Sequence, residues 1–129
     1  ARRGLVVDFS GSWILPRIIG VQKAKELMMT ATEINGTTLN DYGVLYKLVE
    51  KPDLDSELNN LVDLLDKQSF ISICMIKDQI RKGLNTNFDE SLSNETDNQN
   101  SRFVHSDVME GMSAFVEKRQ PNYKNTLDE

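Results

Sequence analysis

The sequence has 129 residues, enough for one ordinary domain, and 39% of them are hydrophobic while 27% are charged. No apolar run approaches the ~20 residues that cross a bilayer, so we expect no membrane partner. The net charge of −5 disfavours a nucleic-acid partner, because binding a duplex requires a clustered basic face.

The start of the chain and its single cysteine bear on the compartment. Residues 1–7 carry basic side chains but lack the long apolar segment of a secretory signal, and they lack an initiator Met. We therefore expect either that Met was removed or that the chain is a piece of a longer protein. Cys74 permits no internal disulfide and lies in the apolar run 70–76, so we expect a buried thiol in a reduced, cytoplasmic protein. One Cys and one His cannot build a zinc site of the Cys/His type, and we expect no metal.

The first elements predicted along the chain are short. Residues 5–8 form an extended piece that runs into a turn of small residues. The apolar residues that follow predict a short helix ending at Gly20, in which Pro16 is tolerated only in the first turn. Apolar spacing then predicts a second helix over residues 22–30.

A single turn and a strand are predicted next. Residues 37–43 favour one helical turn closed by Gly43, and residues 44–49 favour a short β-branched strand. Two short strands are marginal alone, so residues 5–7 and 44–49 resemble pieces of a larger sheet. The predicted fold class is mainly α with one or two short strands.

Four longer helices are predicted in the remaining sequence. Asp53 and Ser69 are candidate N-caps of the first two, and Gly83 ends the second. Asn87 is the candidate cap of the third, but residues 93–100 offer almost nothing to bury and predict a solvated or frayed helix.

The last predicted helix runs from about residue 107 to residue 119, and Pro121 ends it. Val108, Met112, Phe115 and Val116 form its apolar stripe. His105 stands just before the start of this helix, which disfavours a catalytic role.

Two segments far apart in the sequence carry a resemblance to a known family. Residues 4–20, GLVVDFSGSWILPRIIG, resemble the crotonase (enoyl-CoA hydratase/isomerase) signature, in which a Gly-Leu-x-Pro/Val-x-x-Gly-Gly loop leads into a helix ending Leu-Pro-Arg-x-x-Gly. Residues 110–121, EGMSAFVEKRQP, resemble the C-terminal helix of that family, and residues 24–49 follow its intervening pattern. Ser10 departs from the pattern, because the family usually has a second loop glycine there.

The resemblance implies that this chain is the C-terminal helical part of the α/β crotonase spiral fold. Residues 1–52 would be the end of the core with the active-site loop, and residues 53–129 a helical region for oligomerisation and coenzyme A contact. Family members are roughly twice this length, and their first half supplies the two backbone N–H groups of the oxyanion hole. The resemblance therefore implies that this chain is inactive alone. It also implies a homo-oligomer, a trimer or hexamer.

The resemblance also assigns candidate site residues. Asp8 matches a carboxylate of the isomerase-type branches, which favours an isomerase over a hydratase, although an Asp that only shapes the turn is the alternative. Trp13 would line the acyl pocket or be buried in the core. Phe115 and Lys118 would meet the adenine and phosphate of coenzyme A, or else be a core residue and a solvated charge. Coenzyme A enters as part of the acyl-CoA thioester substrate, and no permanently bound cofactor is expected.

A function of a different class stays open. The acidic, polar segment 89–100 and the missing oxyanion-hole half favour a non-catalytic helical interaction or oligomerisation module. The mass of the native polypeptide discriminates the two hypotheses. An enzyme predicts about 28 kDa, twice the 14.7 kDa of this chain.

Overall fold

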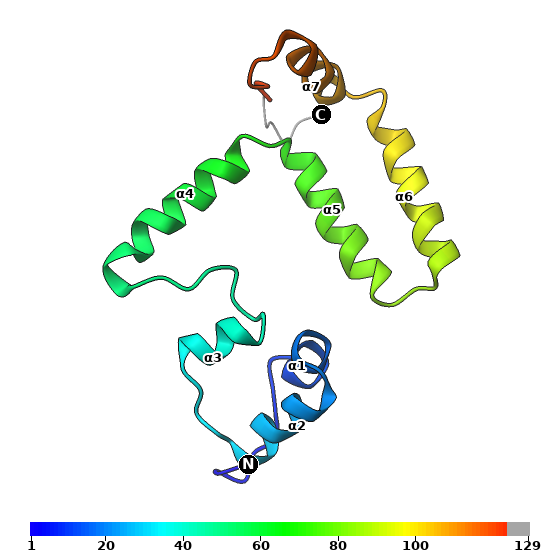
Figure 1. The fold of residues 1–129 in the computed structure, drawn as a ribbon. Helices are drawn as coiled ribbons and strands as arrows, with labels where there is room; N and C mark the ends of the chain where they lie inside the picture. Colours follow the sequence, from blue (N-terminus) through cyan, green and yellow to red (C-terminus); the bar gives the residue numbers. More distant parts are fainter. Residues whose placement is uncertain (124–129) are drawn as a thin grey trace. The chain divides into compact units, whose positions relative to one another are not determined.

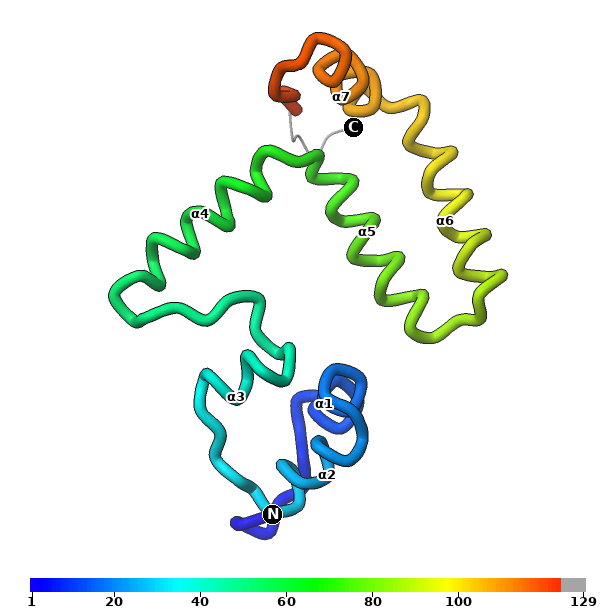
Figure 2. The backbone as a smooth tube through the Cα atoms, viewed as in Figure 1, coloured from blue at the N-terminus to red at the C-terminus, as the bar shows by residue number. Residues whose placement is uncertain are grey.

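The computed structural model describes residues 1–123, which fall into two compact units divided between Leu54 and Asp55. Figure 1 shows that each unit is built from helices, and Figure 2 follows the backbone through them. No β-strand forms within residues 1–123. The predicted mainly α fold is confirmed, whereas the one or two short strands are not found.

The first unit contains a packed pair of helices and two shorter elements. Gly20, at φ 80°, turns the chain between the packed pair and adopts a conformation that residues with a Cβ rarely reach. Ala24 of the second helix is 1% exposed, so its small side chain lets the pair approach closely. The elements of this unit are α1 (Gly11–Ile19), α2 (Val21–Thr30), α3 (Gly36–Asp41) and the 3₁₀ helix η1 (Lys51–Asp53).

Two expectations for this unit are wrong. Residues 5–7 and 44–49 are extended or irregular but unpaired, because a strand requires a hydrogen-bonded neighbour and no described segment supplies one. Pro16 lies inside α1 and beyond its first turn, since the helix already begins at Gly11. Its ring nitrogen removes the N–H that would otherwise bond the carbonyl of Ser12.

Up to residue 123, the second unit contains four helices that begin close to the predicted caps. The Ser69 hydroxyl accepts a hydrogen bond from the Ser72 N–H, and the Asn87 amide oxygen accepts one from the Glu90 N–H at 2.9 Å. Helices α5 and α6 pack against each other. The four helices are α4 (Leu54–Asp66), α5 (Phe70–Gly83), α6 (Phe88–Arg102) and α7 (Ser106–Glu117).

Helix α6 is solvated but not frayed. It is continuous to Arg102 although its central residues are polar, and the Asn87 side chain caps its start. Cys74 is exposed, so the predicted buried thiol is wrong. Cys74 belongs to α5, which packs against α6. The half-buried residues of α5 include Ile71, Met75 and Gln79, and Cys74 lies outside this face.

Little apolar surface is buried in either unit. Among residues 1–123 the buried apolar side chains are those of Ala24 and Ala114. The apolar face of α4 is open, with Leu58 at 55%, Val62 at 53% and Leu65 at 46% exposure. None of the helices in the described part of the chain has the length and apolar character needed to span a bilayer.

Candidate active-site loop and C-terminal helix

A strained loop precedes α1 and carries Asp8. Phe9 and Ser10 adopt φ values of 49° and 60°, in the left-handed region that favours glycine. Each such residue stores roughly 1–3 kcal/mol of strain, and conformations of this kind are concentrated at functional sites. Ser10 stands where the crotonase pattern has glycine, so the backbone keeps the glycine conformation although the side chain has changed.

The turn is closed by close backbone contacts around Asp8. The carbonyl of Asp8 accepts a hydrogen bond from the Gly11 N–H at 2.9 Å. A Cβ on Gly11 would approach Cγ1 of Val7 to 2.8 Å, so a larger residue there would require the Val7 side chain to shift. Asp8 itself is exposed, and its neighbour Phe9 is 94% exposed. The chain thus presents the carboxylate on a rigid turn but does not enclose it.

Trp13 lies at the start of α1 and is 39% exposed, which excludes a buried core position in this chain. The guanidinium of Arg17 lies over the indole, 3.9 Å from the ring centroid. Its Nη1 also donates a hydrogen bond to the Trp13 carbonyl at 2.9 Å. Arg17 therefore covers one ring face and holds the indole in place through a cation–π contact.

The second pair of candidate residues lies at the end of α7. Phe115 is 81% exposed, so it is not a core residue of this chain. Lys118 follows the helix at φ 54° and ψ 38°, again left-handed. Phe115 lies in the last turn of α7 and Lys118 directly follows the helix, so both belong to its C-terminal end. Asp8 and Trp13 belong to the first unit and Phe115 and Lys118 to the second, so each pair is placed only within its own unit.

A partly buried polar cluster fixes the start of α7. The Ser69 hydroxyl donates a hydrogen bond to the Asp107 carboxylate, which also pairs with Nη2 of Arg102 at 3.2 Å. Nδ1 of His105 accepts the Asp107 N–H at 3.2 Å and caps the helix. His105 therefore has a structural role at the helix start, in line with its predicted position.

An ion-pair network folds the chain back at the other end of α7. Both carboxylate oxygens of Glu110 accept from the Arg119 guanidinium, at 2.6 and 2.9 Å, and one also accepts the Asn122 N–H at 2.6 Å. These hydrogen bonds, first that from Arg119, lower the pKa of Glu110 to about 2. Nε of Arg119 donates to Glu117 at 2.5 Å.

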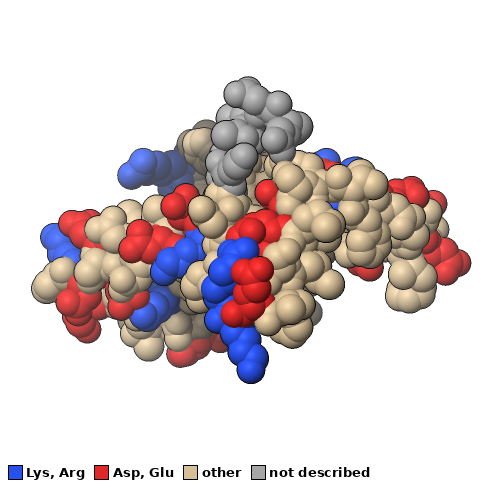
Figure 3. Space-filling view, turned by 90° about the horizontal axis from the view of Figure 1, so that it is seen from above, with Lys and Arg blue, Asp and Glu red and all other residues tan. Residues whose placement is uncertain are grey.

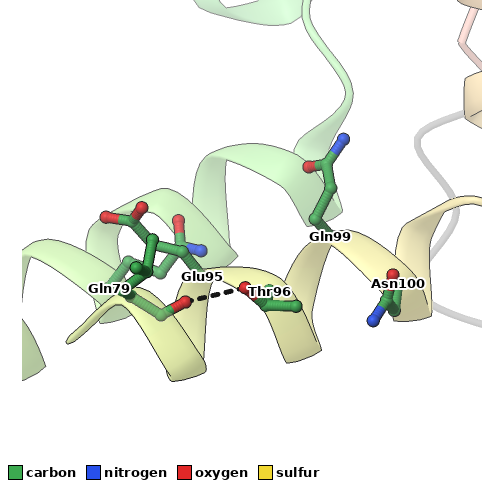
Figure 4. Close-up of a pocket in the computed structure, with 6 residues that line it drawn as sticks. Gln79, Glu95, Thr96, Gln99 and Asn100 are labelled. Carbon is green, nitrogen blue, oxygen red and sulfur yellow. Dashed lines mark hydrogen bonds between the residues drawn. The ribbon is translucent and has the colours of Figure 1, made fainter. Parts of the chain in front are cut away.

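A groove of about 430 Å³ lies between α5 and α6. Figure 4 shows Gln79 of α5 near Glu95 of α6, with Thr96, Gln99 and Asn100 farther along α6. Three of the six lining residues are amides, and the groove contains none of the four predicted site residues. Residues 1–123 hold no group of three or more His, Cys, Asp or Glu side chains placed to bind a metal ion.

The comparisons with known proteins agree with the two motifs. The model of the enoyl-CoA hydratase/isomerase family matches residues 1–126. The chain belongs to this family. It is 31% identical over 120 residues to a crotonyl-CoA hydratase of Syntrophomonas wolfei, covering 93% of this chain and 46% of that protein. It is 28% identical over 123 residues to a 1,2-epoxyphenylacetyl-CoA isomerase of Escherichia coli, covering 95% and 47%.

The fold of this enoyl-CoA hydratase/isomerase family member also matches solved structures. The crystal structure of an enoyl-CoA hydratase from Bacillus anthracis superposes with a TM-score of 0.91 at 27% identity, covering 97% of this chain and 48% of that one. The chain spans about half the length of the curated relatives it matches. The helical arrangement is therefore that of the C-terminal helical part of the crotonase fold.

Sequence reasoning missed three features of these sites. The left-handed residues Phe9 and Ser10 had one usable signal, the replacement of a family glycine by Ser10. Arg17 could have been found from its spacing of four from Trp13, which brings the two side chains together on a helix. The pairing of Glu110 with Arg119 had no spacing signal, because the chain leaves the helix before Arg119 and then turns back.

Proposed function

We propose that the protein carrying this sequence is an isomerase of enoyl-CoA thioesters. The observation that carries the proposal is Asp8, a carboxylate on a strained turn at the start of α1, in a chain of the enoyl-CoA hydratase/isomerase family. Residues 1–52 would contribute this active-site loop. Residues 53–129 would contribute coenzyme A contacts and subunit contacts.

The proposed reaction moves one proton. The Asp8 carboxylate removes a proton from the saturated carbon between the thioester carbonyl and the double bond, and the C–H electron pair is delocalised onto the carbonyl oxygen as a dienolate. The Asp8 carboxyl then returns the proton to a different carbon, so the double bond shifts and no atom is gained or lost. Two backbone N–H donors, which the family resemblance assigns to the other half of the protein, would stabilise the oxyanion.

The position of Asp8 favours isomerisation over hydration, because the family resemblance places the carboxylate of the isomerase-type branches there. A carboxyl at that position can take a proton from one carbon and return it to another. The strained turn supports this role, because it fixes the direction in which Asp8 leaves the backbone. Trp13, held by Arg17, would form part of the wall around the acyl chain.

The end of α7 would bind the nucleotide part of coenzyme A. The exposed Phe115 ring offers a face for an adenine, and the Lys118 ammonium offers a point charge for a phosphate. On the face drawn in Figure 3, Lys and Arg side chains lie beside Asp and Glu side chains. This mixture suits a small phosphorylated ligand better than a nucleic acid.

We also propose that the protein forms a homo-oligomer, a trimer or hexamer. The open apolar face of α4, with Leu58, Val62 and Leu65 about half exposed, supports a subunit contact. Sedimentation of the native protein tests this. A monomer at micromolar concentration would contradict it.

The substitution Asp8→Asn tests the proposed chemistry in the native polypeptide that carries this sequence. We expect turnover of an enoyl-CoA to fall by about 10²–10⁴, with the Michaelis constant little changed, since the isosteric amide cannot carry the proton. Asp41→Asn, at an exposed carboxylate of α3, is the matched control. The mass of the product separates the two reactions, because hydration adds one water and isomerisation adds nothing. Normal turnover by Asp8→Asn would remove Asp8 from the mechanism.

A further inference from the structure

Lys118 occupies a backbone position that a lysine adopts only when its surroundings hold it there. It follows α7 in the left-handed conformation, where helices usually place glycine, and the Arg119 N–H bonds back to the Ala114 carbonyl at 3.0 Å. A residue with a Cβ is strained at this position. The strain falls on the residue proposed to meet the phosphate of coenzyme A.

The residues on both sides of Lys118 are tied into one network. Arg119 donates to both oxygens of Glu110, at 2.6 and 2.9 Å, and to Glu117 at 2.5 Å. The Asn122 N–H bonds the same Glu110 carboxylate at 2.6 Å, so the segment after the helix returns along α7. We call the pair Glu110 and Arg119, with these hydrogen bonds, the clamp.

The two neighbouring cations Lys118 and Arg119 have different surroundings. The Arg119 guanidinium is occupied by two carboxylates. Within residues 1–123 the Lys118 ammonium makes no ion pair, although it is the adjacent residue. One cation therefore shapes the backbone, and the other stays available to a ligand.

We propose that Glu110 and Arg119 are positioning residues, which hold Lys118 left-handed so that its ammonium meets a phosphate of the acyl-CoA nucleotide. This inference rests on the proposed function, and it assigns to the clamp a role in binding the nucleotide rather than in the proton transfer. A planar, bidentate guanidinium is required, because a lysine at position 119 could not engage both carboxylate oxygens in the same way.

The test uses steady-state kinetics of the native polypeptide with an acyl-CoA and with the matching acyl-pantetheine thioester, which lacks the nucleotide. Glu110→Gln and Arg119→Lys should each raise KM for the acyl-CoA by about three- to tenfold at retained kcat. Lys118→Ala should raise it by about tenfold, the order expected for one charge-assisted hydrogen bond. KM for the pantetheine thioester should not change in any variant. Asp78→Asn is the control, because it breaks another short ion pair between a carboxylate and an arginine, Asp78 with Arg81 at 2.6 Å, on α5.

A double-mutant cycle distinguishes positioning from general support of the fold. Once Lys118 is alanine, Glu110→Gln should change KM no further, because no ammonium is left to position. An added increase in that background, an increase for the pantetheine thioester, or an unchanged KM in Glu110→Gln alone would overturn the inference. If Lys118→Ala has no effect, the proposed contact of Lys118 with phosphate fails, and the inference fails with it. If the unmodified protein turns over neither thioester, the proposed function itself is refuted.

Discussion

Replacing Ser69 by alanine tests how the second unit is held together. Ser69 is 7% exposed and has two roles, because its hydroxyl accepts the Ser72 N–H at the start of α5 and donates to Asp107 of α7. The capping bond is long, at 3.4 Å, so its loss should cost about 0.5 kcal/mol, the low end for an N-cap. Loss of the hydrogen bond to a carboxylate should cost about 1.5 kcal/mol, since Asp107 keeps its pairing with Arg102. The predicted loss of unfolding free energy is therefore about 2 kcal/mol.

Urea unfolding followed by far-ultraviolet circular dichroism measures this loss, and amide exchange in α5 and α7 locates it. Asn87→Ala is the matched control, because Asn87 caps α6 through one exposed hydrogen bond and makes no described bond to α7. It should cost about 1 kcal/mol. Ser69→Thr keeps the hydroxyl and should restore most of the loss. Equal losses for Ser69→Ala and Asn87→Ala would refute the inference that Ser69 links α5 to α7.

Three further predictions concern the strained loop, the indole and the clamp. Ser10→Gly should raise the unfolding free energy by about 0.5–1 kcal/mol, because glycine relieves the left-handed strain, whereas Ser12→Gly inside α1 should lower it by a similar amount. Urea unfolding measures both changes, and destabilisation by Ser10→Gly would contradict the argument. Arg17→Ala should shift the emission of the single tryptophan to longer wavelength, because the guanidinium no longer covers the ring, and unchanged emission would show that the contact does not persist in solution. The folded-state pKa of Glu110, about 2, is below its ordinary 4.5, so its stabilising contribution is present above pH 4.5 and is lost as pH falls toward 2. Glu110→Gln should therefore flatten the dependence of the unfolding free energy on pH between these values. An unchanged slope would refute the assignment.

Helices were predictable from this sequence because their signals are local. The hydroxyl of Ser69 and the amide of Asn87 cap helices at the predicted positions, and Gly20 ends the first helix where the sequence indicates. The same local rules failed for Pro16. The helix begins at Gly11, earlier than the apolar pattern indicates, because the left-handed turn at Ser10 starts it. The boundary is set by that turn rather than by the apolar residues.

The candidate site residues stay predictions, and for them the sequence offers residue identities only. The resemblance singled out Asp8 and Lys118, and both lie beside or at left-handed residues in the structure. What the sequence could not reveal is how each is held. The turn at Asp8 depends on the approach of Val7 to Gly11, and the position of Lys118 depends on a bond between Arg119 and Glu110, nine residues apart.

Burial was the least predictable property, and its failures share one cause. An apolar pattern indicates that a face is suited to a nonpolar environment, but it does not say which segment supplies that environment. Cys74 and Phe115 lie in apolar patterns and are exposed in this chain, and residues 44–49 have a strand composition without a strand partner. Each of these segments needs surface from elsewhere, whereas a capped helix needs only its own residues. The chain matches about half the length of its relatives, so subunit contacts and the remaining half are the two sources to test, and an increase in protection of Phe115 and α4 on assembly would identify the first.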